Sequence, residues 1–247
     1  MRKLFSANNR CNAECAYCFA KWNGIYSKQP TFGQEIIGER EVIVYPCCDG
    51  EFFEQQNYLC ITKSIMDKME KVYISISTKK RIAPYMLAAL TDVNKKLIDN
   101  NKGFVKLGIS LSNKEHIPEI EVGTLSYNER LNMLRNIALT GMPTSVTIKP
   151  ILPFIPVQEY FSIIDDIAPI VDRVLLGGLY VCPDTDFYRK YIDGKFITEK
   201  REVTWLAGTP VWDYIANADQ IEQIRKYAIH KGIRPFDSDI ELIRSYK

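Results

Sequence analysis

Short apolar runs alternate with longer amphipathic stretches along most of this chain. The runs are three to seven residues long and rich in β-branched residues. Runs of this kind are typical of strands buried on both faces of a parallel sheet, where the alternation of polar and apolar positions is lost. We therefore expect strands at residues 4–6, 42–45, 72–76, 105–111, 146–148 and 174–176.

The stretches between these runs repeat apolar residues at the spacing of a helix face. We expect a short helix and a loop after Cys18, and helices over residues 57–69, 84–97, 126–138, 161–171 and 219–230. Pro84 suits the first turn of its helix because proline has no backbone N–H to leave unpaired. Ser126, followed by Glu129, forms a capping-box pattern that predicts a helix start. Strands that alternate with helices in this order predict a parallel sheet with right-handed crossovers.

The C-terminal part of the chain breaks this pattern. Over residues 182–218 helical periodicity is lost while aromatic residues accumulate, and connections of that length usually cover something. The segment either plugs one end of an open barrel or lines a substrate site, and residues 233–236 form a candidate seventh strand. We therefore expect an α/β fold in which residues 1–182 form an incomplete (β/α)6 TIM-like barrel. Residues 183–247 should form an irregular C-terminal extension packed on the same domain.

Composition places the chain among ordinary globular proteins. Of its 247 residues 46% are hydrophobic and 25% are charged, and the formal net charge is +2 with both signs interspersed. Such a balance gives no broad cationic field, so tight non-specific binding to nucleic acid is not expected. Met1 leads directly into the first expected strand, and no apolar run is long enough for a signal peptide or a membrane span. We expect a cytoplasmic protein without a membrane partner; the sequence does not predict its oligomeric state.

The candidate chemistry begins with three cysteines near the amino terminus. Cys11, Cys15 and Cys18 are spaced C-x-x-x-C-x-x-C after the first expected strand. Thiolates at that spacing can ligate three irons of a 4Fe-4S cube and leave the fourth iron open to another ligand. The rival zinc site normally needs a fourth Cys or His nearby, and no histidine precedes His116. A structural disulfide is the other alternative, but seven cysteines, an odd number, favour a reducing compartment.

This motif resembles the signature of the radical S-adenosylmethionine (SAM) enzymes, including the aromatic residue before the last cysteine, here Tyr17. The resemblance implies a 4Fe-4S cluster whose fourth iron is held by the amino and carboxylate groups of SAM. It also implies reductive cleavage of SAM to a 5'-deoxyadenosyl radical, with electrons from a donor such as flavodoxin or ferredoxin. The cysteine loop should then lie at the carboxyl ends of the barrel strands, where such barrels place their chemistry.

The carboxyl ends of the expected strands carry candidate SAM ligands. Asp49 and Glu51 follow the second strand, where many radical SAM enzymes have a turn that meets the SAM amino group; a plain loop acid is the alternative. Lys79 follows the third strand and is a candidate partner for the SAM carboxylate, although most such lysines are simply solvated. Ser110 and Ser112, at the end of the fourth strand, are candidate ligands of the ribose or the carboxylate.

Two further candidates lie in later elements. Arg130 is in the first turn of the helix that starts at Ser126, where a guanidinium can clamp a carboxylate with two hydrogen bonds. An ordinary surface arginine is its alternative reading. Ile148, on the fifth strand, is a candidate wall for the adenine, but core packing alone would also explain it.

A longer series of residues resembles the spore photoproduct lyase-like branch of the radical SAM enzymes, over roughly residues 3–170. The series comprises Cys47-Cys48-Asp49, Glu54, Thr78-Lys79, Ser110-Leu111-Ser112, Glu121-Val122-Gly123-Thr124, Arg130 and Lys149-Pro150-Ile151-Leu152-Pro153. The matching positions of that branch bind SAM, which here implies roles for Asp49, Lys79, Ser110 and Arg130. The enzyme that gives the branch its name acts on a thymine lesion in DNA, so a nucleobase or nucleic acid is the first substrate expectation.

Two departures limit what this resemblance carries. First, the branch places a hydrogen-donating cysteine three positions before the acid, where this chain has Pro46. Second, this chain starts at the first expected strand, without the segment that precedes it in the branch. Cys47 and Cys48 are close but shifted. Either one of them, with Cys48 the better candidate, faces the cavity and gives hydrogen to a product radical, or both are apolar fillers. A peptide or small-metabolite substrate, and a non-catalytic iron-sulfur or zinc-binding module, are the alternative functions.

Overall fold

The structure is a computed structural model of the chain. It describes residues 2–4, 11–22, 41–47, 50–54, 70–204 and 208–247. The expected helix over residues 57–69 and the candidate site residues Cys48 and Asp49 lie outside the described residues. Within the described ranges no helix is long and apolar enough to cross a membrane.

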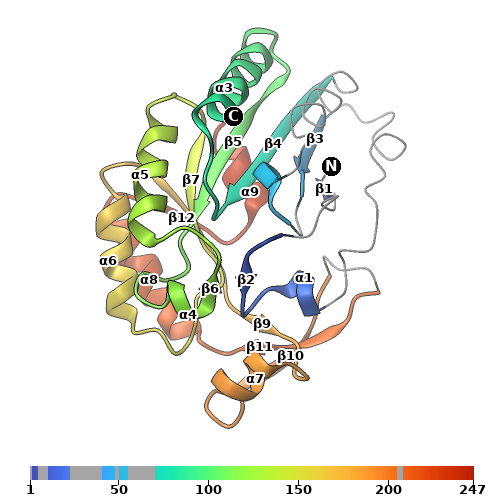
Figure 1. Ribbon diagram of the computed structural model, residues 1–247, viewed down its shortest axis with the longest axis vertical. Helices are drawn as coiled ribbons and strands as arrows, with labels where there is room; N and C mark the ends of the chain where they lie inside the picture. Colours follow the sequence, from blue (N-terminus) through green and yellow to red (C-terminus); the bar gives the residue numbers. More distant parts are fainter. Residues whose placement is uncertain (1, 5–10, 23–40, 48–49, 55–69, 205–207) are drawn as a thin grey trace.

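A parallel sheet of seven described strands forms the centre of the molecule (Figure 1). In spatial order the strands are β1 (Arg2–Leu4), β3 (Glu41–Tyr45), β4 (Lys71–Thr78), β5 (Gly103–Ser110), β7 (Thr144–Ile148), β8 (Arg173–Leu176) and β12 (Arg234–Phe236). Five of the six expected strands are present at their expected places, the first lies at Arg2–Leu4 rather than at residues 4–6, and the candidate seventh strand joins the sheet beside β8. Among the described strands β1 and β12 do not pair with each other, so the barrel is incomplete, as expected.

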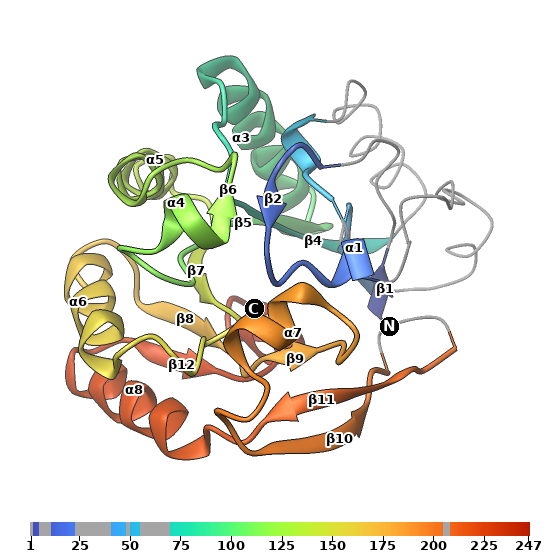
Figure 2. The ribbon, with the colours of Figure 1, turned by 60° about the horizontal axis from the view of Figure 1, so that its bottom comes forward.

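Four helices cover the outer face of the sheet (Figure 2). They are α3 (Pro84–Asp99), α5 (Tyr127–Ala138), α6 (Val157–Ile167) and α8 (Ala218–His230). Pro84 occupies the first turn of α3, and Ser126 with Glu129 forms a complete capping box before α5, which confirms both helix starts. Their buried apolar residues join one core with the outward-facing strand residues, such as Leu97 of α3 with Leu107 of β5.

The inner face of the sheet has its own small core at the end where the strands begin. Tyr73 of β4 and Phe104 of β5 are register partners, and they pack with Leu242 and Ile243 of the C-terminal helix α9 (Asp239–Arg244). This helix therefore closes the amino-terminal end of the barrel, opposite the end at which a barrel carries its chemistry.

The C-terminal extension is more regular than the sequence suggested. It contains an antiparallel sheet of β9 (Tyr180–Val181), β11 (Val211–Ile215) and β10 (Thr198–Glu202), together with helix α7 (Asp186–Tyr191). The sequence did not reveal these short elements because β10 is a polar edge strand, fixed by its pairing with β11 rather than by an apolar pattern. Trp212 of β11 packs edge-on against Trp22 of α1 (Phe19–Trp22), so the extension lies beside the cysteine loop.

Candidate functional site

The cysteine loop, residues 11–18, is docked on residues 120–125, which follow β5 in the chain and which we call the docking segment. Strand β2 (Glu14–Cys15) pairs with β6 (Glu121–Val122), which places Cys15 opposite Glu121. The backbone N–H of Ala16 donates to the carbonyl of Ile120 at 2.7 Å, which extends this ladder. A loop that carries three cysteines is thereby fixed over the carboxyl ends of the central strands.

A second anchor holds the start of the same loop. The backbone N–H of Asn12 donates to the carboxylate of Glu54 at 3.1 Å. Lys80 bridges to that carboxylate at 3.1 Å and donates to the carbonyl of Gly123 at 2.7 Å. Gly123 has φ +77°, and a Cβ there would lie 3.2 Å from the carbonyl oxygen of Asn12. The close approach of loop and docking segment therefore requires glycine.

The three cysteines carry thiols rather than disulfides. Cys15 is buried, while Cys11 and Cys18 are half-buried. Burial raises the pKa of Cys11 to about 11. It also raises the pKa of Cys15, against the opposing effect of Lys79.

The described residues include no group of three or more Cys, His, Asp or Glu gathered tightly enough for one metal ion. A cube spreads its thiolates over separate irons, so this observation bears on a single-ion site and not on a cluster. The cysteine motif implies such a cluster by resemblance, and the donor set fits it: three thiols lie on one docked loop, and the Lys79 ammonium is 3.6 Å from the Cys15 sulfur.

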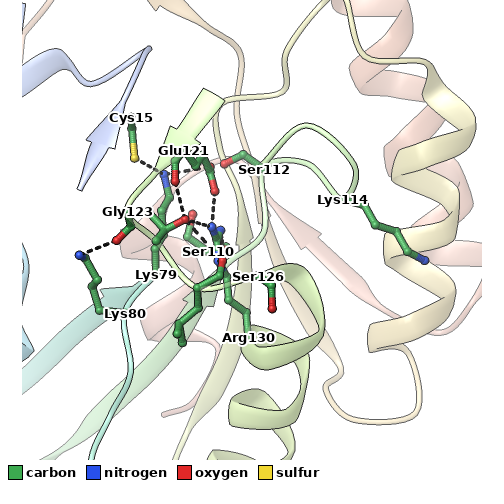
Figure 3. Close-up of polar contacts among 12 residues, drawn as sticks. Cys15, Lys79, Lys80, Ser110, Ser112, Lys114, Glu121, Gly123, Ser126 and Arg130 are labelled. Carbon is green, nitrogen blue, oxygen red and sulfur yellow. Dashed lines mark hydrogen bonds and ion pairs between the residues drawn. The ribbon is translucent and has the colours of Figure 1, made fainter. Parts of the chain in front are cut away.

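Glu121 is the centre of a buried polar network at this site (Figure 3). Its carboxylate pairs with Lys79 at 3.1 Å and with Arg130 at 2.5 Å, and it accepts a short hydrogen bond from the Tyr17 hydroxyl. Lys79 also donates to the Tyr17 oxygen at 2.7 Å. The structure thus brings together Tyr17, Lys79 and Arg130, which come from three separate parts of the sequence.

Burial and charge act in opposite directions on this network. Burial alone would lower the pKa of Lys79, but Glu121, Tyr17 and Cys15 outweigh it and hold that pKa well above its usual range. Burial would raise the pKa of Glu121, but Lys79 and Arg130 hold it below its ordinary value. Burial raises the pKa of Tyr17 well above its normal value. The network is therefore an ammonium, a carboxylate, a guanidinium and a neutral phenol at neutral pH.

Arg130 is a fully buried residue of α5, which excludes the surface reading. Besides Glu121, its guanidinium donates to the carbonyl oxygens of Leu125 at 2.8 Å and Ser110 at 3.0 Å, and to the Thr124 hydroxyl. The side chain thus ties the end of β5 to the docking segment. All three guanidinium nitrogens have protein partners.

The remaining candidates differ in how they meet the site. Ser112 is fully buried; its hydroxyl oxygen lies 3.0 Å from the Tyr17 oxygen, and its O–H donates to the Lys149 carbonyl at 3.3 Å. Ser110 is buried at the end of β5. Ile148 is fully buried in the core that joins the sheet to its outer helices, so packing accounts for it. A contact between Ile148 and adenine stays a prediction.

The turn after β3 is only partly described. Glu51 is 5% exposed and accepts from the Thr78 hydroxyl at 2.7 Å. Burial raises the pKa of its carboxyl to about 7, with Thr78 opposing the rise. Cys47 is buried and has φ +57°, a conformation that non-glycine residues seldom adopt. The hydrogen-donor role of Cys47 or Cys48 stays a prediction.

Two residues of the site were not selected from the sequence. Glu121 appeared only as part of a motif, and nothing in the sequence showed that two cations would converge on it. Asn113 directly follows Ser112 and is fully buried, and neither polar atom of its amide has a hydrogen-bond partner among the described residues. The position of Asn113, directly after Ser112 at the end of a strand, was the feature of the sequence that could have identified it.

Comparison with known proteins adds a structural likeness. No family model matches the chain, and no curated protein matches it. Spore photoproduct lyase in complex with a dinucleoside spore photoproduct is similar with a TM-score of 0.65 and 12% identity, over 93% of this chain and 75% of that chain. A mutant of that lyase with bound AdoMet and the same dinucleoside gives 0.66 at 12% identity over the same shares.

SuiB of Streptococcus suis bound to S-adenosylmethionine is similar with a TM-score of 0.61 and 11% identity, over 99% of this chain. This chain spans about half the length of SuiB, covering 52% of it. At such identities the likeness is one of fold. The chain therefore has the incomplete α/β barrel fold of the radical SAM enzymes spore photoproduct lyase and SuiB.

Proposed function

We propose that this chain is a radical SAM enzyme. The observation that carries the proposal is the docking of a C-x-x-x-C-x-x-C loop against a buried Lys79–Glu121–Arg130 network, over the carboxyl ends of a parallel sheet. A structural loop would need no lysine ammonium 3.6 Å from a cysteine sulfur. The fold shared with two SAM-binding enzymes agrees with this function.

Cys11, Cys15 and Cys18 would hold a 4Fe-4S cluster through three of its irons. When bound and reduced, such a cluster supplies the electron that cleaves SAM to methionine and a 5'-deoxyadenosyl radical, which abstracts hydrogen from the substrate. The chain's own task is to fix the loop, orient SAM and exclude water. The β2–β6 ladder and the Glu54–Lys80 bridge perform the first task.

Lys79 is the residue we assign to the SAM carboxylate. Its side chain is 18% exposed, and Glu121 and Tyr17 aim its ammonium toward Cys15. A charge-assisted bond from this ammonium would orient the methionine part of SAM beside the cluster. Glu51, with Asp49, is assigned to the SAM amino group, Ser110 and Ser112 to its ribose or carboxylate, and Ile148 to its adenine.

Arg130 is assigned to the same carboxylate site, through Glu121. A direct contact would require the guanidinium to release one of its present partners, which a buried cation does at high cost. Its position between Glu121 and Ser110 supports a positioning role, in which Arg130 holds the carboxylate that in turn holds Lys79.

For the substrate, a nucleobase or nucleic acid is the first choice by analogy with spore photoproduct lyase, whose complex contains a dinucleoside spore photoproduct. A peptide or small metabolite is the second choice. A thiol of Cys47 or Cys48 is assigned to return hydrogen to the product. A flavodoxin- or ferredoxin-like electron donor and a cytoplasmic location complete the proposal.

The test is the formation of 5'-deoxyadenosine. The full chain is reconstituted anaerobically with iron and sulfide, reduced with dithionite, given SAM and analysed by chromatography with mass detection. We expect 5'-deoxyadenosine from the wild-type chain and none from Cys11→Ala, Cys15→Ala or Cys18→Ala. A non-catalytic iron-sulfur module would form a cluster without releasing 5'-deoxyadenosine, and that result would reject the enzyme function.

A further inference from the structure

The inner face of the sheet carries a polar patch in the barrel lumen. Along β5, Leu107 and Ile109 face the outer core, so Lys106 and Gly108 face the lumen. Strand register places Ser75 beside Lys106, and Ser77 and Ser145 on either side of Gly108. Thr147, two residues after Ser145, faces the same way. We call this set the lumen patch: Ser75, Ser77, Lys106, Gly108, Ser145 and Thr147.

Gly108 makes room for the Lys106 side chain at the centre of the lumen patch. A Cβ at this position would lie 2.9 Å from the Lys106 ammonium nitrogen and 3.0 Å from the Ser145 carbonyl oxygen. The hydroxyls of Ser77 and Thr147 approach to 3.4 Å across the same strand. The lysine side chain therefore extends along its own strand toward the carboxyl end, into the space that a larger residue would fill. Ser77 is exposed, so the patch opens at that end.

Two polar groups of the lumen patch have no partner among the described residues. Lys106 is fully buried and its ammonium nitrogen makes no hydrogen bond, and the fully buried hydroxyl of Ser145 makes none either. Burial lowers the pKa of Lys106 to about 8, and Asp239 of α9 opposes that effect, but the Lys106 ammonium has no hydrogen-bond partner in the described structure. Unpaired buried donors destabilise a fold, so the fold itself does not account for them.

We propose that the lumen patch binds an oxyanion of the substrate, a carboxylate or a phosphate, through the Lys106 ammonium and the Ser145 hydroxyl. This inference rests on the proposed function, because it places the substrate in the lumen below the SAM site. A desolvated ammonium with hydroxyl donors around it is chemically matched to a single acidic group. Phe104 and Tyr73 close the lumen beneath, so the anion would be the deepest part of the substrate.

The arrangement also orients the rest of the substrate. Ser110 lies two residues beyond Gly108 on the same strand face, at the end of β5 that the cysteine loop covers. A substrate held by its acidic group at Lys106 would therefore present its other end toward the strand ends and the cluster loop. The part of the substrate that enters the lumen thus carries a carboxylate or a phosphate, as an acidic metabolite or a nucleotide does.

The experiment measures anion binding by the full chain directly. Thermal unfolding midpoints are recorded while sodium acetate or sodium phosphate replaces sodium chloride at constant ionic strength. Wild type, Lys106→Met and Ser145→Ala are compared, with Lys95→Met, an exposed lysine of α3, as the matched control. We expect a saturable rise of the midpoint in wild type and Lys95→Met, and at least a tenfold weaker response in Lys106→Met and Ser145→Ala.

The two anions separate the two sources: a stronger response to acetate identifies a carboxylate substrate, and a stronger response to phosphate identifies a phosphorylated one. Equal responses in wild type and Lys106→Met, or no response beyond chloride, would overturn the inference. The titration is run with and without the reconstituted cluster. Anion binding without SAM cleavage would reject the proposed function alone, whereas SAM cleavage without anion binding would reject this inference alone.

Discussion

Glu121 decides how the cations of the site are arranged. It is 1% exposed, and it lies between a fully buried Arg130 and the partly exposed Lys79. A buried carboxylate with two cations is stable only while both hold their positions, because removing one leaves charge without compensation. The two cations therefore have separable roles: Arg130 fixes the carboxylate, and Lys79 remains able to meet a ligand.

The first prediction concerns Arg130. Arg130→Ala should lower the free energy of unfolding by about 3 to 5 kcal/mol, because Glu121 would remain buried without the closer of its two cations. Urea denaturation of the full chain measures this. The double variant Arg130→Met, Glu121→Gln removes both charges and should recover part of the loss. A single variant as stable as wild type would show that the buried pair does not hold the docking segment.

The second prediction concerns Lys79. Lys79→Ala should weaken SAM binding by roughly 1.5 to 3 kcal/mol, about tenfold to a hundredfold, because a charge-assisted bond to the carboxylate is lost. Equilibrium binding to the reconstituted chain measures the change. Arg81→Ala is the matched control, since that neighbouring cation is 72% exposed and pairs with Glu129. Equal SAM affinity in wild type and Lys79→Ala would remove Lys79 from the SAM site.

The third prediction concerns Lys106 and pH. Its pKa falls from 10.5 to about 8 on folding, so between these values the unfolded chain binds the proton that the folded chain has lost. Through this group stability rises as pH rises from about 8 to 10.5, and below pH 8 the full cost of burying the ammonium is present. Lys106→Met should therefore stabilise the chain at pH 7 by about 3 kcal/mol, an upper value from the pKa shift.

The stabilising effect of Lys106→Met should shrink as the pH is raised toward 10.5. Unfolding midpoints at pH 7 and pH 10, compared between wild type and Lys106→Met, measure it. Lys95→Met should change neither midpoint appreciably. Destabilisation by Lys106→Met at pH 7 would mean that the ammonium has a stabilising partner in the native chain.

At the scale of elements, two very short strands place the cysteine loop. β2 and β6 have two residues each, and β6 is followed at once by Gly123. Such strands are too short to show a period of two, and their pairing depends on a partner more than a hundred residues away. For this reason the sequence predicted the loop and its cysteines, but not the segment on which the loop is docked.

The fourth prediction compares two glycines. Gly123 and Gly141 both have positive φ, +77° and +73°, but only a Cβ at Gly123 would meet other atoms, since nothing lies within 4 Å at Gly141. Gly141→Ala should cost about 1 kcal/mol from backbone strain alone. Gly123→Ala should cost more and should also speed the loss of the cluster to a chelator. Equal rates of cluster loss in the two variants would show that the contact with Asn12 does not position the loop.

The missed elements of the C-terminal extension have a similar cause. β10 reads Thr-Glu-Lys-Arg-Glu, a run in which no apolar face can be recognised. Its position follows from pairing with β11, and from pairs such as Lys200 with Asp213 at 2.7 Å and Arg201 over the Tyr214 ring at 3.8 Å. Tertiary pairing thus overrides weak local propensity.

At the scale of the whole molecule, the parallel barrel was predictable because its strands are short runs rich in β-branched apolar residues that alternate with amphipathic helix-like stretches. The helix starts at Pro84 and Ser126 were predictable because each depends on residues close to one another in the sequence. The lumen was less accessible to prediction. Lys106 interrupts an otherwise apolar strand, and only the register with Ser75 and Ser145 shows that it faces the interior. The unpartnered polar groups of Lys106 and Ser145 can therefore be recognised only once the pairing of the strands is known.

The most direct test of the central claim is electron paramagnetic resonance of the reconstituted, dithionite-reduced chain before and after SAM is added. The account predicts a reduced 4Fe-4S signal whose g values change with SAM, because one iron has no protein ligand. Cys15→Ala should lack the stoichiometric signal, while Cys182→Ala, a cysteine outside the motif, should retain it and its response to SAM. A signal that SAM leaves unchanged, or a full signal in Cys15→Ala, would contradict the account.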